Sequence, residues 1–510
     1  MLYVSVPFIN CLHNVHIEAL CLGQCYSCDS NRGNTPMDTH ALRQQAIRIA
    51  HISECHRLEI EDFSGDSESG SERALFVWSD IETGASIHLT LQGNGNLISY
   101  SREELESPES ELLVWSLQQR AEHFLELHYP NESAVFSLTK AIHGQRSIRF
   151  AYAEMCSGMP LPVTGWFAEI SLSGQVIQFR YYGRSSFFPE ISSPIPKDTL
   201  LPGVTDALHI RLAVVALNPQ ILDLEKEELR LVYVPVQQVH SINAETGELM
   251  ISDGDDAAET AYISVPEIHG EIESSRTTEE IVGVAGNDFI KLREKGLGEI
   301  VGVVWGSRDR DGGSHDTSLD GFFYKRSAQT IKAIVNKSDG RVLSFMSFLK
   351  QQGPHWLGRQ QCLTVALRFL KQALPDYTKY LQLKVTEGRS PETSSTERFQ
   401  FRIRIKDIPV YLQLLTLDVN RTTGRVVQYS GLDFNPALLA GVPVTPMIDE
   451  NRAKQIYLEK LDLKLSWKRN RRDVKLPYQL IYTPVHRDKE REIRCIDAIT
   501  GELICSNDKI

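Results

Sequence analysis

The feature that most constrains this chain is an internal duplication. Four short patterns return in the same order at slowly growing offsets. They are Gly95-Asn-Leu-Ile-Ser-Tyr100 and Gly340-Arg-Val-Leu-Ser-Phe345 at 245 residues, Ala121-x-x-Phe124-Leu125 and Ala366-x-x-Phe369-Leu370 at 245, Met159-Pro160-Leu161 and Ile408-Pro409-Val410 at 249, and Asn243-Ala-Glu-Thr-Gly247 and Asp497-Ala-Ile-Thr-Gly501 at 254. Loop insertions explain the growing offset, so we expect one ancestral block to be written twice.

The duplication divides the chain into four segments. Residues 37–250 form the first copy and residues 283–510 the second. The segment between them, 251–282, is acidic, with Arg276 its only lysine or arginine, and is expected to be a linker. Residues 1–36 show no sustained periodicity and are expected to be a poorly ordered extension, so that either Met1 or Met37 is the natural start.

Each copy also divides into three smaller units, and each unit contains a turn centred on a glycine. The turn glycines are Gly95, Gly174, Gly247, Gly340, Gly424 and Gly501. Polar residues precede each glycine and a strand pattern follows it, as expected for hairpins of three to five loop residues. None of them belongs to a phosphate-binding loop, because the sequence contains neither GxGxxG nor GxxxxGK[ST].

Helical patterns precede the strands of each unit. One helix is expected to bury an apolar face formed by Leu113, Leu117, Ala121, Phe124 and Leu125. A third helix of the first copy is expected through Ala207, Ile210, Val214 and Leu217. Its counterpart in the second copy is expected to start at the N-cap Asp449 and to run through Ala453, Ile456, Tyr457 and Leu461. The strands alternate, as in Phe399–Ile405, which indicates antiparallel pairing with one buried face. The predicted fold class is α+β, with two tandem copies of three helix-plus-antiparallel-hairpin units each.

The second copy carries a series of motifs whose order is distinctive. They are Phe399-x-Phe401-Arg402-x-Arg404, Ile408-Pro409-Val410, Val419-x-x-x-Thr423-Gly424, Leu480-Ile-Tyr482 and Asp497-Ala-Ile-Thr-Gly501-Glu-Leu503. In this series the chain resembles the YcdB/YcdC repeated domain of Gram-positive bacteria, over most of residues 37–506. The smaller unit is similar to PepSY-type modules. The first copy departs from the motifs at Met159-Pro160-Leu161 and at Asn243.

The resemblance implies a function class rather than a reaction. The family has no assigned catalytic residues to carry over. PepSY-type modules occur in the propeptides of secreted metallopeptidases, where they are regarded as inhibitors or folding aids. The resemblance therefore implies a binding or regulatory role, with a peptidase among the partners.

Three cysteines near the N-terminus form the sharpest chemical motif. Cys21, Cys25 and Cys28 have the C-x3-C-x2-C spacing with which radical S-adenosylmethionine enzymes hold an iron–sulfur cluster, and a zinc site is the alternative. No alternating strand–helix barrel pattern follows the motif, and only one cysteine knuckle is present. A cysteine-bearing extension without metal is the expectation these observations favour, and no cofactor is predicted.

Other catalytic machinery is absent from the sequence. It contains neither GxSxG nor HExxH, and no spacing pairs its histidines. His56, His128 and His209 lie on helical patterns and are expected to pack or to lie at the surface. No catalytic residue is therefore predicted.

The net charge and the targeting signals limit which partners and which cellular compartment we expect. The formal net charge of −12 argues against nucleic acid as a partner, and no apolar run approaches the length of a membrane span. The N-terminus lacks the cationic start and cleavage site of a secretory signal, and nine cysteines do not form a disulfide framework. We expect a cytoplasmic protein with reduced thiols, while the family resemblance leaves the cell envelope open.

The sequence thus predicts a non-catalytic protein or peptide-binding or regulatory protein. Binding is expected by strand addition to an open sheet edge or between the copies. The alternatives are a metalloprotein or enzyme that uses the N-terminal cysteines with zinc or an iron–sulfur cluster, and a purely structural spacer. The sequence does not indicate the oligomeric state.

Overall fold

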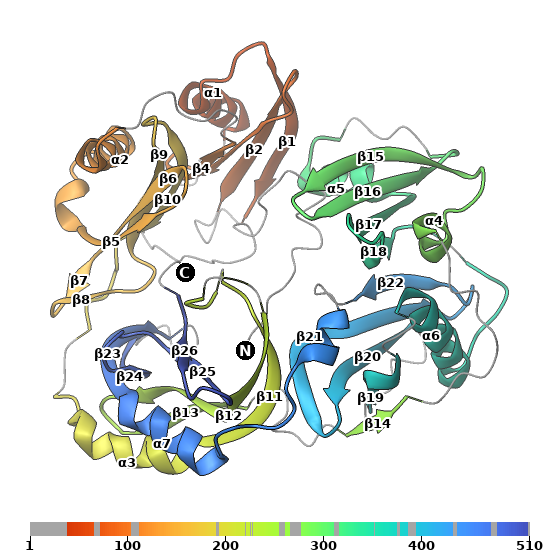
Figure 1. The fold of residues 1–510 in the computed structure, drawn as a ribbon. Coiled ribbons are helices and arrows are strands. Elements are labelled where there is room, and N and C mark those ends of the chain that lie inside the picture. Colours follow the sequence, from red (N-terminus) through yellow and green to blue (C-terminus); the bar gives the residue numbers. More distant parts are fainter. Residues whose placement is uncertain are drawn as a thin grey trace.

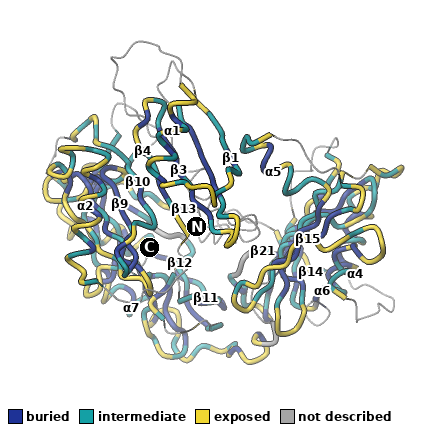
Figure 2. Tube along the Cα trace, turned by 90° about the horizontal axis from the view of Figure 1, so that it is seen from above, coloured by how far each residue is buried: buried dark blue, intermediate teal, exposed yellow. Residues whose placement is uncertain are grey.

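A computed structural model provides the structure of the chain. It describes residues 38–65, 72–103, 112–189, 193–219, 221–224, 226, 228–253, 261–265, 277–310, 316–350, 352–374, 378–385, 394–431, 436–470 and 477–507. Strand is the most common secondary structure among these residues, with 45% in strand and 22% in helix. Figure 1 shows that the strands are gathered in groups around a ring, and Figure 2 shows that buried residues concentrate along the strands.

Two strand groups build an eight-stranded antiparallel sheet. We call a helix together with the strands that follow it a group and number the groups in chain order; group 4 contains a second helix, α5, between its strands. Group 1 contains α1 (Thr39–Ala50), β1 (His56–Ser64), β2 (Arg73–Asp80), β3 (Ser86–Gln92) and β4 (Leu97–Arg102). Group 2 contains α2 (Val114–His128), a 3₁₀ turn (Ser133–Val135), β5 (Ser137–His143), β6 (Ser147–Ala153), the short pair β7 (Met155–Cys156) and β8 (Met159–Pro160), β9 (Gly165–Ser171) and β10 (Val176–Gly183). Their order in the sheet is β1-β2-β3-β4-β10-β9-β6-β5.

The remaining groups share a sheet of sixteen strands. Group 3 contains α3 (Lys197–Ala207), β11 (His209–Leu217), β12 (Glu228–Asn243) and β13 (Leu249–Asp253), and β14 (Tyr262–Ser264) follows it. Group 4 contains α4 (Thr278–Val282), β15 (Phe289–Leu297), β16 (Ile300–Ser307), α5 (Leu319–Ser327), β17 (Thr330–Asn336) and β18 (Val342–Ser347). Group 5 contains α6 (Arg359–Ala373), a 3₁₀ turn (Thr378–Tyr380), β19 (Leu381–Lys384), β20 (Thr396–Ile405), β21 (Ile408–Asn420), β22 (Val426–Ser430) and a second 3₁₀ turn (Pro436–Gly441). Group 6 contains α7 (Glu450–Lys460), β23 (Leu461–Arg469), β24 (Tyr478–His486), β25 (Ile493–Asp497) and β26 (Leu503–Cys505).

The predicted fold class is wrong in its α+β class and its helix-plus-hairpin unit, although two repeats fit the structure. The described residues are mostly β, with only seven α-helices, and the strands form large antiparallel sheets rather than one hairpin beneath each helix. All six predicted turn glycines do have positive φ, between 66° and 93°, but each turn joins only the last two strands of its group. A lone hairpin is only marginally stable in water, so the additional strands supply the buried face.

One predicted helix is also wrong. Ala207 ends α3, whereas Ile210, Val214 and Leu217 lie on β11, which pairs with β12 along its whole length. The apolar run in this segment is continuous, and a continuous run fits a buried strand as well as a helix face. The counterpart in group 6 is correct for Ala453, Ile456 and Tyr457, and Asp449 caps α7 by accepting the backbone N–H of Arg452. Leu461, however, lies beyond the helix and opens β23.

Groups 3 and 6 interlock through two equivalent sets of contacts. Ile242 pairs with Tyr482, and Tyr233 pairs with Ile496, so that β12 is paired antiparallel with both β24 and β25. The backbone N–H of Ala244 donates to the Leu480 carbonyl, and that of Ala498 donates to the Leu231 carbonyl, both at 2.9 Å. Each contact thus occurs twice with the roles exchanged, as at the interface of a two-fold dimer.

A second, smaller contact joins group 4 to group 1. Phe322 of α5 packs with Ile60, Leu75 and Val77 in a small apolar cluster. The backbone N–H of Glu61, on the edge strand β1, donates to the Thr317 carbonyl at 2.8 Å. This contact covers part of the β1 edge and closes the ring in Figure 1 between group 1 and group 4.

Candidate functional site

The cysteine motif predicted as a metal site lies outside the described residues. Cys21, Cys25 and Cys28 all precede Asp38, where the described chain begins. The zinc and iron–sulfur alternatives for these residues therefore stay predictions. No helix of the described residues is long and apolar enough to cross a membrane.

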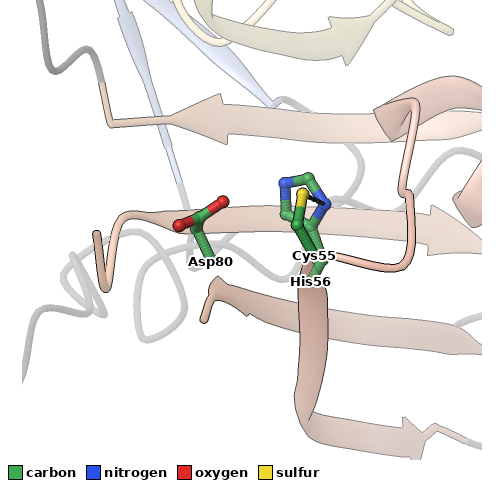
Figure 3. A group of neighbouring side chains, drawn as sticks. All are labelled: Cys55, His56 and Asp80. Carbon is green, nitrogen blue, oxygen red and sulfur yellow. Dashed lines mark hydrogen bonds between the residues drawn. The ribbon is translucent and has the colours of Figure 1, made fainter. Parts of the chain in front are cut away.

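Among the described residues, one group of side chains is arranged as metal ligands would be: Cys55, His56 and Asp80 (Figure 3). His56 opens β1 and Asp80 closes β2, and the two residues are directly opposite in the antiparallel register. Residues opposite each other in such a pair present their side chains to the same face. The Cys55 carbonyl accepts the backbone N–H of Ile81 at 2.8 Å, which continues the pairing beyond the strand.

The three side chains converge at the exposed end of these strands. One possible ligand atom from each lies within 4.8 Å of the other two, and the Cys55 Sγ lies 3.3 Å from Nδ1 of His56. The Ser53 hydroxyl oxygen lies 2.9 Å from this sulfur and 3.0 Å from Nδ1. Cys55 is exposed, whereas His56 and Asp80 are half-buried, so the cluster is accessible from solvent.

Hydrogen bonds keep the Asp80 carboxyl group ionised. Its Oδ1 accepts the backbone N–H groups of Glu82 and Thr83 and the Thr83 hydroxyl, at 2.7–3.0 Å. The pKa of Asp80 lies below its usual value, chiefly because of the backbone and hydroxyl hydrogen bonds from Thr83. The side chain of Cys55 contributes in the same direction.

Sequence reasoning missed this cluster. The helical pattern predicted at His56 is wrong, because His56 opens β1. His128 does lie on α2, and His209 opens β11. Only the register of β1 against β2 brings Asp80 to His56, and a spacing of 24 residues in sequence carries no such signal.

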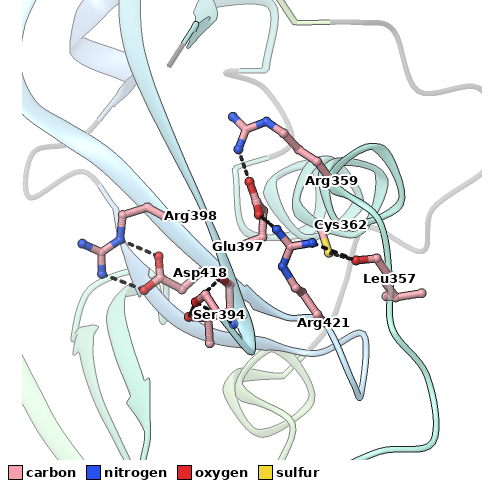
Figure 4. Close-up of polar contacts among 9 residues, drawn as sticks. Leu357, Arg359, Cys362, Ser394, Glu397, Arg398, Asp418 and Arg421 are labelled. Carbon is pink, nitrogen blue, oxygen red and sulfur yellow. Dashed lines mark hydrogen bonds and ion pairs between the residues drawn. The ribbon is translucent and has the colours of Figure 1, made fainter. Parts of the chain in front are cut away.

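A buried ionic trio is the second polar cluster (Figure 4). Glu397, whose side chain is 1% exposed, forms ion pairs with Arg359 and Arg421. Arg421 also donates to the Leu357 carbonyl at 3.2 Å. Burial raises the pKa of the neighbouring Cys362 thiol, and the two guanidinium groups only partly offset this effect, so the thiol is protonated rather than a thiolate nucleophile. The trio is therefore a structural network.

The outer edge of group 5 carries an added strand. β14, from the segment between the predicted copies, pairs antiparallel with β19, with Ile263 opposite Leu383. The Val385 backbone N–H extends this ladder by donating to the Ala261 carbonyl at 2.8 Å. Arg402 of the neighbouring strand β20 lies over the Tyr262 ring, 3.6 Å from its centroid. A predicted linker segment thus binds group 5 as an extended peptide.

The equivalent edge in group 2 is β5. Both β5 and β19 follow a helix and a 3₁₀ turn and pair with the next strand, β6 or β20. Leu138 is opposite Tyr152, as Leu383 is opposite Phe401. Within the described residues, β5 ends the eight-stranded sheet and has no strand on its outer side.

Comparisons with known proteins relate most of the chain to one family. The model of the YcdB, YcdC repeated domain matches residues 39–183 and 272–433. The uncharacterized protein YcdB of Bacillus subtilis (strain 168) is 30% identical over 486 residues, which are 93% of this chain and 99% of that protein. The uncharacterized protein YcdC of the same organism is 25% identical over 437 residues, 84% and 91% of the two chains.

A solved structure is also similar in part. The C-terminal domain of YpeB from Bacillus megaterium aligns with 44% of this chain and 98% of its own length, at 16% identity and a TM-score of 0.26. The matched regions of the repeated-domain model contain groups 1 and 2 and groups 4 and 5. Since these regions span more than half of the sequence and one relative aligns along nearly its full length, the chain belongs to the YcdB, YcdC repeated-domain family.

Proposed function

We propose that the protein is a non-catalytic peptide-binding protein that accepts an extended peptide as an added strand on β5. The observation that supports this most directly is the pairing of β14 with β19, the equivalent edge in group 5. Strand addition uses main-chain hydrogen bonds for affinity and alternate side chains for specificity. The proposal extends to β5 a binding mode that the chain already uses once.

The exposure of two equivalent leucines supports the choice of β5. Leu383, opposite Ile263 of the added strand, is 5% exposed. Leu138, which occupies the same register position in β5, is 42% exposed. Leu383 belongs to the main apolar core, whereas Leu138 is exposed at the free edge. A peptide with an apolar residue opposite Leu138 would cover it, and burial of such a surface favours binding.

The residues around the edge suggest the chemistry of the peptide. In group 5, Arg402 supports the aromatic residue Tyr262. Ala153 in group 2 is equivalent to Arg402, because Ala153 is opposite Ser137 on β5 as Arg402 is opposite Gln382 on β19. The β5 edge therefore has no guanidinium group at this position. We therefore expect β5 to prefer an apolar, β-branched peptide. A peptidase or its propeptide is the partner class that the resemblance to PepSY-type modules implies.

A binding measurement with a defined peptide tests the proposal. The probe is a labelled synthetic peptide with the sequence of residues 259–267, which includes β14. We expect fluorescence anisotropy to detect saturable binding to the full chain. A peptide with the same sequence but N-methylated at alternate amides should not bind, because it cannot complete the ladder.

Two matched substitutions locate the binding edge. Leu138→Glu should weaken binding by about tenfold or more, since a carboxylate would then face the apolar peptide residue. Ile290→Glu on β15 is the control, because Ile290 is also 42% exposed and also lies on an edge strand. The proposal is wrong if the peptide does not bind, or if Ile290→Glu weakens binding as much as Leu138→Glu does.

A further inference from the structure

We propose that Cys55, His56 and Asp80 form a zinc site with three protein ligands and a fourth position open to solvent. The inference does not depend on the peptide-binding proposal. It rests on the convergence of three different ligand types at one strand end, on their hydrogen bonding, and on a comparison with the equivalent strand end in group 4.

The backbone of this strand end does not require these side chains. In group 4, Phe289 opens β15 opposite Ser307, as His56 opens β1 opposite Asp80. The Asp288 carbonyl accepts the backbone N–H of Arg308 at 2.9 Å, which matches the bond from Ile81 to Cys55 at 2.8 Å. The same corner thus forms with Asp288, Phe289 and Ser307, so the metal-binding residue types in group 1 are not explained by the local fold.

The distances fit a tetrahedral ion. Zinc–sulfur and zinc–nitrogen bonds of about 2.3 and 2.0–2.1 Å place the two ligand atoms roughly 3.6 Å apart at a tetrahedral angle. The Cys55 Sγ and the His56 Nδ1 are 3.3 Å apart, and all three ligand atoms lie within 4.8 Å of one another. A small rotation of the exposed Cys55 side chain would complete the geometry.

The hydrogen bonds show which ligand atoms carry a lone pair. The backbone N–H of Ser53 donates to Nδ1 of His56 at 3.3 Å, so this nitrogen is the unprotonated one; it faces the thiol, and a bound ion would take the lone pair that accepts this long hydrogen bond. The bonds to Asp80 described above all end on Oδ1, which leaves Oδ2 as the oxygen that can bind an ion. The ring orientation and the carboxylate are therefore held before any ion binds.

The donor set selects the ion. A thiolate, an imidazole and a carboxylate favour zinc over calcium and magnesium, which prefer sites made of oxygen ligands. The two negative ligands balance the charge of a divalent ion. Cys55 is exposed, so water can occupy the fourth position, and the Ser53 hydroxyl oxygen lies 2.9 Å from the sulfur. Three ligands with an open position are typical of zinc sites that bind a water or a substrate group.

The test uses the full chain with Cys11, Cys21, Cys25 and Cys28 replaced by serine, so that the N-terminal cysteines cannot bind the metal. We expect this background variant to bind one equivalent of zinc in competition with a chromophoric chelator. With cobalt in place of zinc, we expect a thiolate-to-metal charge-transfer band. Cys55→Ser should abolish the band, and Cys55→Ser, His56→Gln and Asp80→Asn should each weaken zinc binding by about a hundredfold or more.

A matched control separates the site from surface binding. His143→Gln changes an exposed histidine elsewhere in the same sheet and should leave the stoichiometry and affinity unchanged. Cys55 is exposed, so Cys55→Ser should retain the unfolding midpoint of the background variant, and a loss of zinc binding then reports the site rather than the fold. The proposal is overturned if the background variant binds no stoichiometric zinc, or if Cys55→Ser leaves zinc binding intact.

Discussion

Groups 2 and 5 have the same backbone arrangement but differ in the chemistry of a buried position. The Leu112 backbone N–H donates to the Leu172 carbonyl, as that of Leu357 donates to the Arg421 carbonyl, both at 2.9 Å. The turn glycine lies against an equivalent leucine in each group. A Cβ on Gly174 would lie within 3.2 Å of the Leu112 side chain, and a Cβ on Gly424 would lie within the same distance of that of Leu357. The two groups can therefore be compared residue by residue.

The difference lies in three equivalent residues. Val114, Ile148 and Leu172 of group 2 correspond to Arg359, Glu397 and Arg421 of group 5. Ile148 is 3% exposed and Glu397 is 1% exposed, so a buried aliphatic residue in one group is a buried carboxylate in the other. One group thus carries three aliphatic residues where the other carries an ionic trio, and we expect the scaffold to tolerate either set only when the members change together.

A neighbouring ion pair is the same in both groups. Arg149 is opposite Glu169 and Arg398 is opposite Asp418, and each arginine donates two hydrogen bonds to its carboxylate. These pairs lie next to the position that differs. The contrast shows that the buried trio, rather than the sheet-surface pair, distinguishes the two groups.

The largest expected effect comes from breaking the ionic trio at its centre. Glu397→Ile leaves the Arg421 side chain, which is 10% exposed, without its carboxylate. An uncompensated buried charge costs about 3–5 kcal/mol. We expect a loss of this size in the local opening free energy of α6 and β20, measured by hydrogen exchange of peptides from these elements.

An exposed ion pair provides the control for this substitution. Glu294 on β15 pairs with Lys291 at 2.7 Å, and its side chain is 51% exposed. Glu294→Ile removes the same charge from a strand and should change stability by less than about 0.5 kcal/mol. If Glu397→Ile also costs less than about 1 kcal/mol, the trio is not the coupled network described here.

An intermediate and equal effect is expected where groups 3 and 6 repeat each other's contacts. The Tyr233 hydroxyl donates to the Ile448 carbonyl at 2.9 Å, and the Tyr482 hydroxyl donates to the Ile195 carbonyl at 3.0 Å. Tyr233→Phe and Tyr482→Phe should each cost about 0.5–1.5 kcal/mol in urea unfolding, because each removes one equivalent hydrogen bond. The exposed Tyr324 gives a Tyr324→Phe control with no change.

The pH dependence separates the two tyrosines. Burial raises the pKa of both hydroxyl groups; Glu450 and Asp449 raise that of Tyr233 further, whereas Lys197 opposes the rise for Tyr482. Above about pH 10, the unfolded tyrosine loses its proton while the native hydroxyl keeps it, so native stability falls as pH rises. Phenylalanine removes this loss. The cost of Tyr233→Phe should therefore shrink more at alkaline pH than that of Tyr482→Phe, and the reverse order would contradict the assignment.

Local signals in the sequence predicted parts of the fold well. Asp449 caps α7 as expected, accepting the backbone N–H of Arg452, and Asp38 caps α1 in the same way by accepting that of Ala41. These features depend on a few neighbouring residues. The same holds for the turn glycines, whose positive φ is a local requirement.

Features that depend on strand register could not be predicted in this way. His56 meets Asp80 only through the pairing of β1 with β2, and β14 meets β19 across more than 100 residues. The ionic trio could be noticed in the sequence at one position, because Glu397 stands where the first copy has Ile148 at the 249-residue offset. Its partners Arg359 and Arg421 lie on different elements, so their convergence follows only from how α6 packs on its sheet.

The smallest expected effect is the most decisive for the comparison. The combined variant Arg359→Val, Glu397→Ile and Arg421→Leu gives group 5 the three residues of group 2. Well-packed apolar replacements of a whole buried ion network are commonly neutral or stabilising, and Arg359 is already 38% exposed, so we expect a change within about 1 kcal/mol of the native chain. Hydrogen exchange of α6 and β20 measures it beside Glu397→Ile. A triple variant as unstable as Glu397→Ile would mean that the surroundings of the two trios have diverged, and that group 5 depends on its charges in a way that group 2 does not.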